Sequence, residues 1–422
     1  MSTIPQHAPA EGTTSHTTLS LPLIAALILF ALLPHSALAQ SFSVLYTFLG
    51  QEDGGIPESS LVMDAAGNLY GTTVEGGNYT CSSSCGNVFK LDPNGNETNL
   101  HTFNSGQDGS FPYISGVTLD RSGNLYGVTS FGGTGRIGIV YKLDPAGNET
   151  ILHNFPGKAG DGNFPQEPSV VLDAAGNLYG TTIQGGGAGC RGFGCGTVFR
   201  LDKNEREVAV ALNDSASAPT ALVFNPATGK LYGTTIQGGG AGCSGLGCGT
   251  VFSVDKQGKL TVVYTFQGAP DGATPLGGLA VDKSGNVYGT TWSGGNSTAC
   301  PNSGCGTVFK VTPTGKATVL YRFSGPDGLI PYSGVVVGRD GALYGTTFGG
   351  GASGWGTIFR VDRTGNESVL HSFTDGDDGA SPMGGFAVGR DGTLYGTASQ
   401  GGATAGDLCF PFGCGTVFKI TR

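Results

Sequence analysis

The most constraining feature of this chain is a motif that recurs seven times. The string GNLYGTT spans residues 67–73, and the tyrosines of successive variants are 56, 53, 53, 56, 56 and 51 residues apart. Such a period is slightly longer than that of common four-stranded propeller blades and much shorter than a domain. Nearly all of the 422 residues therefore form one repeat array rather than two or three domains. The repeat tyrosines are Tyr70, Tyr126, Tyr179, Tyr232, Tyr288, Tyr344 and Tyr395.

Each interval predicts four short β-strands. The first copy contains SSLVMD, the turn AAGN, LYGTT, a Gly/Cys-rich loop, NVFKLD, the turn PNGN and ETNLHTF. The strand segments are rich in Val, Leu, Phe, Tyr and Thr, and two of the three connections have the Asn, Asp, Gly and Pro residues of tight hairpins. Glycine supplies 77 residues, so we expect many tight turns and very little helix.

The two ends of the repeat array are out of phase with each other. SVLYTF at residues 43–48 matches the fourth strand of a blade, whereas TVFKI at residues 416–420 matches a third strand. If the first strand joins the last blade, it completes that sheet and closes the ring. An open solenoid would instead leave an incomplete unit where polar caps are expected. The prediction is an all-β fold, a single seven-bladed β-propeller with four antiparallel strands per blade, closed by the N-terminal strand.

The order of antiparallel strands divides the connections between two faces. Turns between the first and second strands, and between the third and fourth, lie on one face. They include Asp64 to Asn68 and Asp92 to Asn96, which have hairpin chemistry. The long, variable, cysteine-bearing loops lie on the other face. Binding residues concentrate on such loops, so we expect any ligand to bind there.

The first 39 residues predict a secretory signal peptide. The apolar stretch from Leu19 to Leu33 is shorter than the roughly 20 residues needed to span a bilayer, and Ala37 and Ala39 match a signal-peptidase site. We expect cleavage after Ala39, with residues 1–39 as signal peptide and residues 40–422 as propeller. The segment through Thr18 has no Lys or Arg, so an uncleaved anchor is the alternative.

Charge and hydropathy limit the partners of the mature chain. The formal net charge is −9, and removal of Glu11 with the presequence leaves −8. Because no Lys/Arg cluster could follow a phosphate backbone, we expect no nucleic-acid partner. No other long apolar segment is present, so we expect no membrane span in the mature chain and a secreted or cell-surface location. We also expect a monomer.

The ten cysteines fall into five local pairs. Each pair lies in the loop between the second and third strands of a blade, and the two blades without cysteine lack both members. Cysteines that occur two at a time in an exported chain predict disulfides. The competing zinc interpretation is disfavoured, since the pairs belong to separate blades and have no nearby histidine. The predicted bonds are Cys81–Cys85, Cys190–Cys195, Cys243–Cys248, Cys300–Cys305 and Cys409–Cys414.

The histidines give no sign of a catalytic centre. Three of the six lie in the presequence, and the others share one position on the fourth strand, where other blades carry tyrosine. A large, partly polar ring at this position indicates packing, so we expect no catalytic residue, no metal and no cofactor. The residues at this ring position are His101, His153, His371, Tyr46, Tyr264 and Tyr321.

Aspartates recur in a DGxxP motif between the fourth strand and the next blade. Their repetition indicates a turn in which Asp caps its own loop, with glycosidase chemistry or Ca²⁺ binding as alternatives. The copy from Asp214 to Pro219 is degenerate. The motif contains Asp53, Asp108, Asp161, Asp271, Asp327 and Asp378, and the seven prolines are Pro57, Pro112, Pro165, Pro219, Pro275, Pro331 and Pro382.

Some residues in or beside the cysteine loops interrupt the repeat and are therefore candidates for specificity. Aromatic and arginine side chains on one face suit sugar or protein recognition, and the alternative is that they pack the glycine loops together. The candidates are Arg136, Arg191, Phe193, Trp292, Trp355, Phe410 and Phe412.

The YGTT strings, the double glycine, CGTVFK and the GNET turn resemble the GloVer-type tandem repeat, over residues 43–421. That family comprises exported bacterial proteins with varied surface anchors. The resemblance implies a propeller-like array at or outside the cell envelope, with no chemistry to carry over. This chain has no recognisable C-terminal anchor, its fourth repeat has EREVAVALNDS in place of the usual turn and strand, and repeats three and four share IQGGGAGC.

Three functions are compatible with these observations. The first is an exported, non-enzymatic binding or scaffold propeller whose Gly/Cys loop face binds extracellular carbohydrate or an envelope protein. The second is a polysaccharide lyase or hydrolase that uses loop carboxylates. The third is a structural surface spacer. Propeller folds host both binding and catalysis, so the fold alone does not choose between them.

Overall fold

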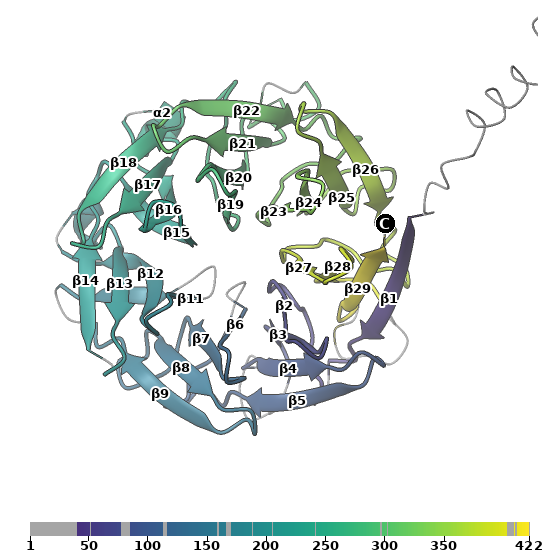
Figure 1. Cartoon of the computed structure of the whole chain (residues 1–422), viewed down its shortest axis with the longest axis horizontal. Coiled ribbons are helices and arrows are strands. Elements are labelled where there is room, and N and C mark those ends of the chain that lie inside the picture. The colour runs from purple at the N-terminus through teal and green to yellow at the C-terminus, as the bar shows by residue number, and fades with distance from the viewer. Residues whose placement is uncertain are drawn as a thin grey trace, which may run out of the picture. The chain divides into compact units, whose positions relative to one another are not determined.

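Seven antiparallel sheets surround a central axis, with the inner strands near the axis and the long strands at the rim (Figure 1). The computed structural model describes residues 40–421, apart from residues 51, 77–84, 113–115, 158–159, 166–169, 188, 205, 241, 296–297, 302, 403–408 and 410–411. Residues from Gln40 onward form one compact unit. The sequence prediction of a seven-bladed propeller is confirmed.

The sheets follow the chain in order and are called blades I to VII. In each blade the first strand is nearest the axis and the fourth is outermost. Their strands are β2 (Val62–Met63), β3 (Leu69–Thr73), β4 (Asn87–Leu91) and β5 (Glu97–Thr102) in blade I; β6 (Thr118–Leu119), β7 (Leu125–Thr129), β8 (Ile139–Leu143) and β9 (Glu149–Asn154) in blade II; β10 (Gly162–Pro165), β11 (Val171–Leu172), β12 (Leu178–Gly185), β13 (Thr197–Leu201) and β14 (Glu207–Ala211) in blade III; β15 (Ser217–Asn225), β16 (Lys230–Gln237), β17 (Thr250–Val254) and β18 (Leu260–Thr265) in blade IV; β19 (Ala280–Val281), β20 (Val287–Thr291), β21 (Thr307–Val311) and β22 (Ala317–Arg322) in blade V; β23 (Val336–Val337), β24 (Leu343–Thr347), β25 (Thr357–Val361) and β26 (Glu367–Ser372) in blade VI; and β27 (Ala387–Val388), β28 (Leu394–Ala398), β29 (Thr416–Thr421) and β1 (Ser41–Thr47) in blade VII.

The N-terminal strand completes the last blade. β1 pairs antiparallel with β29, from Ser41 opposite Thr421 to Thr47 opposite Thr416. The sheet order β1-β29-β28-β27 therefore contains both ends of the compact unit. This confirms the closure that the phase of the two ends predicts, and it covers the edge of β29 that would otherwise be exposed.

Blades III and IV differ from the others in their inner strands. In blade III, β10 and β11 both pair with β12, so the sheet contains five strands. In blade IV the equivalent stretch is the single strand β15, which has an irregularity between Pro219 and Leu222. The unusual segment before β15 does not remove the outer strand of blade III, because β14 pairs with β13 over five residues. These two blades have the longest second strands, β12 and β16.

The YGTT motif is explained by an aromatic ring on the neighbouring strand. Gly71 of β3 lies opposite Phe89 of β4 in the register. A Cβ atom on Gly71 would lie 2.8 Å from Phe89 Cζ, which is too close for any side chain. Phe89 itself is fully buried. The glycine is therefore required by the packing of the third strand and not by the bend of its own strand.

Aromatic pairs connect most blades to the next. Phe48, at the end of β1, packs edge-on against Phe89 of blade I with ring centroids 5.2 Å apart. Edge-to-face pairs of this kind contribute about 0.5–1.5 kcal/mol beyond their buried area. Blade III has Leu212 at this position, in one apolar cluster with Phe252 of blade IV. The other pairs are Phe103–Tyr141, Phe155–Phe199, Phe266–Phe309, Phe323–Phe359 and Phe373–Phe418.

A glycine, a proline and one backbone hydrogen bond form a joint between consecutive blades. In the joint between blades IV and V, the Thr274 N–H donates to the carbonyl of Cys248 at 2.9 Å. A Cβ on Gly249 would lie 2.3 Å from the Thr235 carbonyl oxygen and 2.7 Å from Cδ of Pro275. The proline of each DGxxP motif thus packs on a glycine of the preceding blade.

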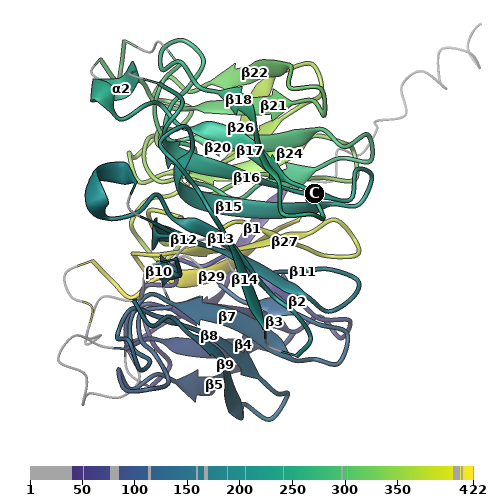
Figure 2. The same cartoon turned by 90° about the vertical axis from the view of Figure 1, so that its left-hand side faces the viewer.

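The two faces carry different connections, as the strand order predicts: short turns on one side and longer loops on the other (Figure 2). On one face, tight turns are held by aspartate: Asp64 Oδ1 accepts hydrogen bonds from the N–H groups of Ala66 and Asn68, both at 2.9 Å. The other face, called the loop face, carries the cysteine loops and the short turns η1 (Cys190–Gly192) and α2 (Gly242–Gly245).

The joint predicts a large stability difference between two glycine substitutions. Gly249 and Gly392 both have φ of 93°, so alanine strains the backbone at each by about 1 kcal/mol. Nothing lies within 4 Å of a Cβ on Gly392, whereas one on Gly249 overlaps the joint. We expect G249A to lower the free energy of unfolding by at least about 3 kcal/mol, as measured by urea denaturation. Equal losses in G249A and the control G392A would contradict the steric role of the joint.

Candidate functional site

The loop face carries most of the exposed apolar side chains of the described residues. Nine large hydrophobic side chains are exposed among the described residues, and six of the nine belong to the loop face. Apolar groups gathered on one face are a feature of interaction surfaces. The six are Leu49, Phe131, Phe193, Leu246, Trp355 and Phe412.

A cleft of about 890 Å³ lies on this face between the loops of blades III and IV. Its volume is in the range of small-molecule and oligomer sites. Residues from blades V and VI also contribute to it, so the cleft extends beyond the two loops. Among its lining residues are Ile183, Gln184, Arg191, Phe193, Asp214, Ile236, Gln237, Leu246, Leu276 and Tyr332.

The two walls of the cleft come from the duplicated sequence IQGGGAGC. Ile183 and Gln184 lie on β12 of blade III, and Ile236 and Gln237 occupy the equivalent positions on β16 of blade IV. Each copy is followed by a disulfide loop with an apolar side chain at its tip, Phe193 in one and Leu246 in the other. The long second strands β12 and β16 therefore form two equivalent walls of the cleft, one on each of two neighbouring blades.

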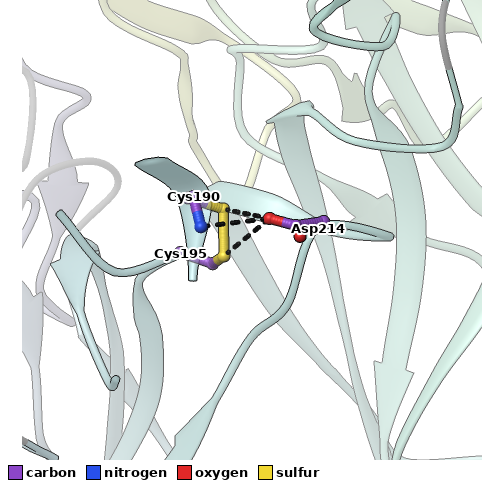
Figure 3. A group of neighbouring side chains, drawn as sticks. All are labelled: Cys190, Cys195 and Asp214. Carbon is purple, nitrogen blue, oxygen red and sulfur yellow. Dashed lines mark hydrogen bonds between the residues drawn. A yellow bond between two sulfur atoms is a disulfide. The ribbon is translucent and has the colours of Figure 1, made fainter. Parts of the chain in front are cut away.

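A carboxylate positions the loop of blade III. The Cys190 N–H donates a hydrogen bond to Asp214 Oδ1 at 3.0 Å. The same oxygen lies 3.2 Å from Cys190 Sγ and 3.6 Å from Cys195 Sγ (Figure 3). Those two sulfurs form a disulfide and have no hydrogen, so they contact the carboxylate without hydrogen bonding to it. They are not available as thiolate metal ligands either.

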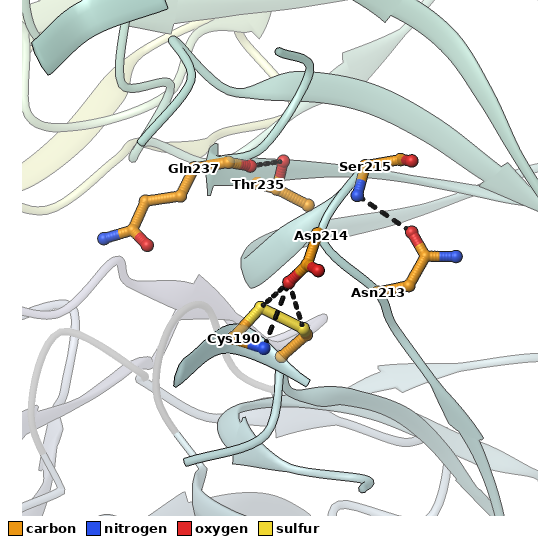
Figure 4. Close-up of a disulfide and its surroundings, with 7 residues drawn as sticks. Cys190, Asn213, Asp214, Ser215, Thr235 and Gln237 are labelled. Carbon is orange, nitrogen blue, oxygen red and sulfur yellow. Dashed lines mark hydrogen bonds between the residues drawn. A yellow bond between two sulfur atoms is a disulfide. The ribbon is translucent and has the colours of Figure 1, made fainter. Parts of the chain in front are cut away.

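Asp214 can contact the disulfide because the neighbouring Asn213 accepts the hydrogen bonds that hold the turn. Asn213 Oδ1 accepts the Ser215 N–H at 2.9 Å, and the Asn213 carbonyl accepts the Ala216 N–H at 2.8 Å (Figure 4). In other copies the aspartate caps the loop through a different amide: Asp53 Oδ2 accepts the Leu49 N–H at 2.9 Å. In the degenerate DGxxP copy the Asp214 carboxylate is therefore free to contact the disulfide. The Gln237 side chain points away from that disulfide (Figure 4).

The predicted disulfides are present wherever the structure describes both cysteines. The bonds Cys190–Cys195, Cys243–Cys248, Cys300–Cys305 and Cys409–Cys414 all form, each in a loop between a second and a third strand. Cys85 is also disulfide-bonded. Its predicted partner, Cys81, lies outside the described residues. Local bonds of this kind stabilise glycine-rich loops by restricting the unfolded chain.

The structure brings together only two of the predicted specificity residues. Arg191 and Phe193 both line the cleft, and Phe193 is 70% exposed. Arg136 is exposed on a loop of blade II, and Trp292 is partly buried at the end of β20. Trp355 and Phe412 are exposed on blades VI and VII, away from the cleft lining. Phe410 lies outside the described residues.

Sequence reasoning missed several residues of the cleft. Gln184 and Gln237 lie two residues after the YGTT motif, and Leu276 and Tyr332 follow the repeat prolines. The residue after each repeat proline differs from blade to blade, although the proline itself is constant. This variation is the signal that could have identified Leu276 and Tyr332 as cleft residues. The only sequence signal for Asp214 is that its copy of the DGxxP motif departs from the other copies.

The ring position and the DGxxP aspartate interact at the rim. The Tyr46 hydroxyl donates to Asp53 Oδ2 at 3.0 Å, and the His371 and Asp378 side chains are hydrogen-bonded at 3.0 Å. Tyr264 donates to Asp271 and Tyr321 to Asp327 in the same way. Blade III has Val210 at this position, opposite Val198. The rings and aspartates thus support the outer strands and lie at the rim, outside the cleft.

Glutamates at the start of some outer strands face this rim. Glu97 is half-buried, and desolvation together with the nearby Asp53 raises its pKa to about 7. Desolvation raises the pKa of Glu149 and Glu367 to about 7 in the same way, with Asp108 and Asp327 as the neighbouring charges. The rim histidines shift in the opposite sense, because burial lowers the pKa of His101 and His371.

Comparison with protein families decides what kind of repeat this is. A family model, the Gloeobacter/Verrucomicrobia repeat, matches residues 29–192, 79–300 and 300–422. The chain belongs to the Gloeobacter/Verrucomicrobia repeat family. This confirms the resemblance to GloVer-type repeats. No curated protein matches the chain.

Solved structures show the same fold at low identity. A streptogramin B lyase is 14% identical with a TM-score of 0.60, over 90% of this chain and 97% of that one. A catalytically inactive variant of virginiamycin B lyase from Staphylococcus aureus, with quinupristin, is 12% identical with a TM-score of 0.59, over 91% and 99%. A gluconolactonase from Xanthomonas campestris is 13% identical with a TM-score of 0.44, over 92% of each. The similarities to the two lyases establish the propeller fold of this repeat protein and no activity.

No helix in the described part of this repeat protein is long and apolar enough to cross a membrane. The four described disulfides are consistent with an extracytoplasmic environment.

The raised pKa of Glu97 predicts a pH-dependent stability. Between about pH 4.5 and pH 7 the folded chain keeps a proton on Glu97 that the unfolded chain loses, so the free energy of unfolding falls as pH rises through this window. The rim histidines act in the opposite direction, since their lowered pKa makes stability rise with pH. We therefore expect E97Q to be more stable than the parent at pH 7.5, with a smaller difference at pH 5.

Urea denaturation at the two pH values measures this difference. The control is E52Q, because Glu52 is exposed on the neighbouring turn. A gain in E97Q that is the same at pH 5 and pH 7.5, or that E52Q reproduces, would contradict the buried-carboxyl explanation.

Proposed function

We propose that this repeat protein is an exported, non-enzymatic binding propeller whose loop face binds extracellular carbohydrate in the cleft between blades III and IV. The observation that carries the proposal is the cleft itself: two equivalent walls, each with an Ile-Gln pair, a disulfide loop and an apolar tip. A repeated wall suits a ligand that is itself repetitive. Polysaccharides have this property.

The chemistry of the lining supports a sugar ligand. The amides of Gln184 and Gln237 can donate and accept hydrogen bonds, as sugar hydroxyls require. The exposed Phe193 ring offers a flat apolar surface on which a sugar ring can stack. Arg191 provides a planar cation that can bind a carboxylate-bearing sugar in a bidentate manner.

Binding is favoured over hydrolysis by the acids available in the cleft. The only carboxylate among the described lining residues is Asp214, which accepts the Cys190 N–H and contacts the disulfide. Glycoside hydrolysis normally uses two carboxyl groups that flank the scissile bond. The described lining also contains no histidine that could act as a general base. The cleft therefore suits ligand retention better than acid–base chemistry.

Export is a separate part of the proposal. It rests on residues 1–39, whose apolar stretch and Ala37/Ala39 pattern predict a signal peptide, and on the disulfide-bonded loops.

Ligand screening with two matched variants tests the function. Thermal unfolding is measured against a panel of plant, fungal and bacterial polysaccharides, and each mixture is assayed for released reducing or unsaturated ends. A ligand at 100 times its dissociation constant adds about 2.7 kcal/mol of stability. We expect a stabilising polysaccharide without products, and at least about tenfold weaker binding by F193A.

The control is F412A, because Phe412 occupies the same loop position in blade VII and is 58% exposed. It should bind like the parent. Equal losses in F193A and F412A would move binding out of the cleft. Released products would replace the binding function with an enzyme, and a panel without any stabilising polysaccharide would favour a structural spacer or a protein partner.

A further inference from the structure

Three potential metal ligands meet where the outer strands of blades II and III adjoin. His153 lies on β9, Asp161 lies in the loop that follows, and Glu207 is the first residue of β14. His153 Nε2 lies 3.7 Å from Asp161 Oδ2 and 3.6 Å from Glu207 Oε2. One ligand atom from each residue lies within 4.8 Å of the others. The cluster is at the rim, distinct from the cleft.

His153 makes no hydrogen bond to Asp161 or to Glu207. Separations of 3.6 and 3.7 Å exceed the 2.7–3.2 Å of a hydrogen bond. His153 Nε2 and Glu207 Oε1 are buried without a hydrogen-bond partner. Their side chains are only 17% and 18% exposed, so water reaches them poorly. Buried polar atoms without partners are costly, and such a site commonly accommodates an ion or a water molecule.

The other copies of this rim position show what happens without a third ligand. At His371 the ring closes on Asp378 to 3.0 Å. The residue that faces that pair from the next blade is Phe42, which stacks on the His371 ring at 3.8 Å. With Glu207 as the third group, the His153 ring stays 3.7 Å from Asp161 and 3.6 Å from Glu207. The wider spacing is therefore a property of the His/Asp/Glu combination.

That spacing is close to the spacing in a metal coordination shell. Zn²⁺ binds imidazole nitrogen and carboxylate oxygen at about 2.0–2.2 Å, which places neighbouring ligands of a tetrahedral ion about 3.3–3.6 Å apart. The observed separations of 3.6 and 3.7 Å are within a few tenths of an ångström of this range. Small side-chain movements would complete the shell.

The environment also prepares the ligands. The His153 ring packs edge-on against Phe155, with centroids 4.7 Å apart, which fixes its orientation. Burial lowers the pKa of His153. Desolvation, the charge of Asp161 and a hydrogen bond to Asp161 raise the pKa of Glu207 to about 7.

We propose that His153, Asp161 and Glu207 bind a divalent transition-metal cation of the Zn²⁺ type, which joins the outer strands of blades II and III. One imidazole and two carboxylates are ligands that such cations accept, and water can fill the remaining position. His101, Asp108 and Glu149 form a wider copy between blades I and II, with the His101 Nε2 3.9 Å from each carboxylate. The sequence alone predicts no metal, because its histidines share a position that indicates packing.

The chain supplies its own control substitution. Tyr46 and Tyr321 occupy the ring position in other blades, and each donates a hydrogen bond to its aspartate beside a rim glutamate. H153Y should therefore fold like the parent while it lacks the metal-binding nitrogen. Circular dichroism and thermal unfolding in the presence of a chelator verify the fold of the variant.

The test is the number of Zn²⁺ ions bound at equilibrium by the untagged full chain, measured by dialysis and elemental analysis. We expect H153Y to bind one equivalent fewer than the parent, and Co²⁺ to give the parent a visible absorption band that H153Y lacks. Equal stoichiometry in the two proteins, including zero in both, would overturn the proposal.

A second pair of variants tests whether Glu207 is a metal ligand or only a buried charged group. E207Q removes a proposed ligand, whereas E367Q removes the equivalent rim glutamate beside Tyr321. We expect at least about tenfold weaker Zn²⁺ binding by E207Q and parental binding by E367Q. Similar Zn²⁺ affinities in E207Q and the parent would contradict the role of Glu207 as a ligand.

Discussion

The propeller depends on the joint at which each blade receives a backbone hydrogen bond from the next. The donor is always the residue before the DGxxP proline, and in every copy this residue has a positive φ of 51–56°. The acceptor is the carbonyl before the glycine that starts the third strand of the preceding blade, at 2.8–3.2 Å. A strained backbone at seven equivalent places persists because the packing on both sides determines it. The donors are Ile56, Phe111, Phe164, Ala218, Thr274, Ile330 and Ser381.

Because the joints hold the ring together, the sequences of the loops on the loop face can vary. The glycine and proline of each joint allow no side-chain change, as the 2.3 Å approach of a Cβ on Gly249 to the Thr235 carbonyl illustrates. The loops beyond the joint have no such limit, and local disulfides restrict them. The degenerate copy before Pro219 retains the joint but loses the usual capping aspartate, which releases Asp214 to the disulfide of blade III. Variation in the loops of blades III and IV forms the cleft between these two blades.

The fold could be predicted from the sequence because each of its determinants is local and repeated. Seven tyrosines fix the number of blades, and the phase of SVLYTF and TVFKI fixes the closure that β1 and β29 make. The disulfides follow from paired occurrence. The cleft could not be predicted, because it depends on how far β12 and β16 extend and on which blades face each other. The rim cluster was hidden for the same reason: His153 and Glu207 are on different blades, and only the register of the outer strands brings them within 3.6 Å.

The central claim is that seven equivalent joints hold a closed ring, and amide hydrogen exchange tests it most directly. The Ile56 N–H donates to the Cys414 carbonyl, so this joint lies at the closure between blades VII and I, together with the pairing of β1 and β29. The other six donor amides lie between blades that the chain connects continuously. The account predicts that Ile56 is protected from exchange as strongly as Thr274 and Ile330. An Ile56 amide that exchanges orders of magnitude faster than those two would show that the ring opens at the closure, and would contradict the account.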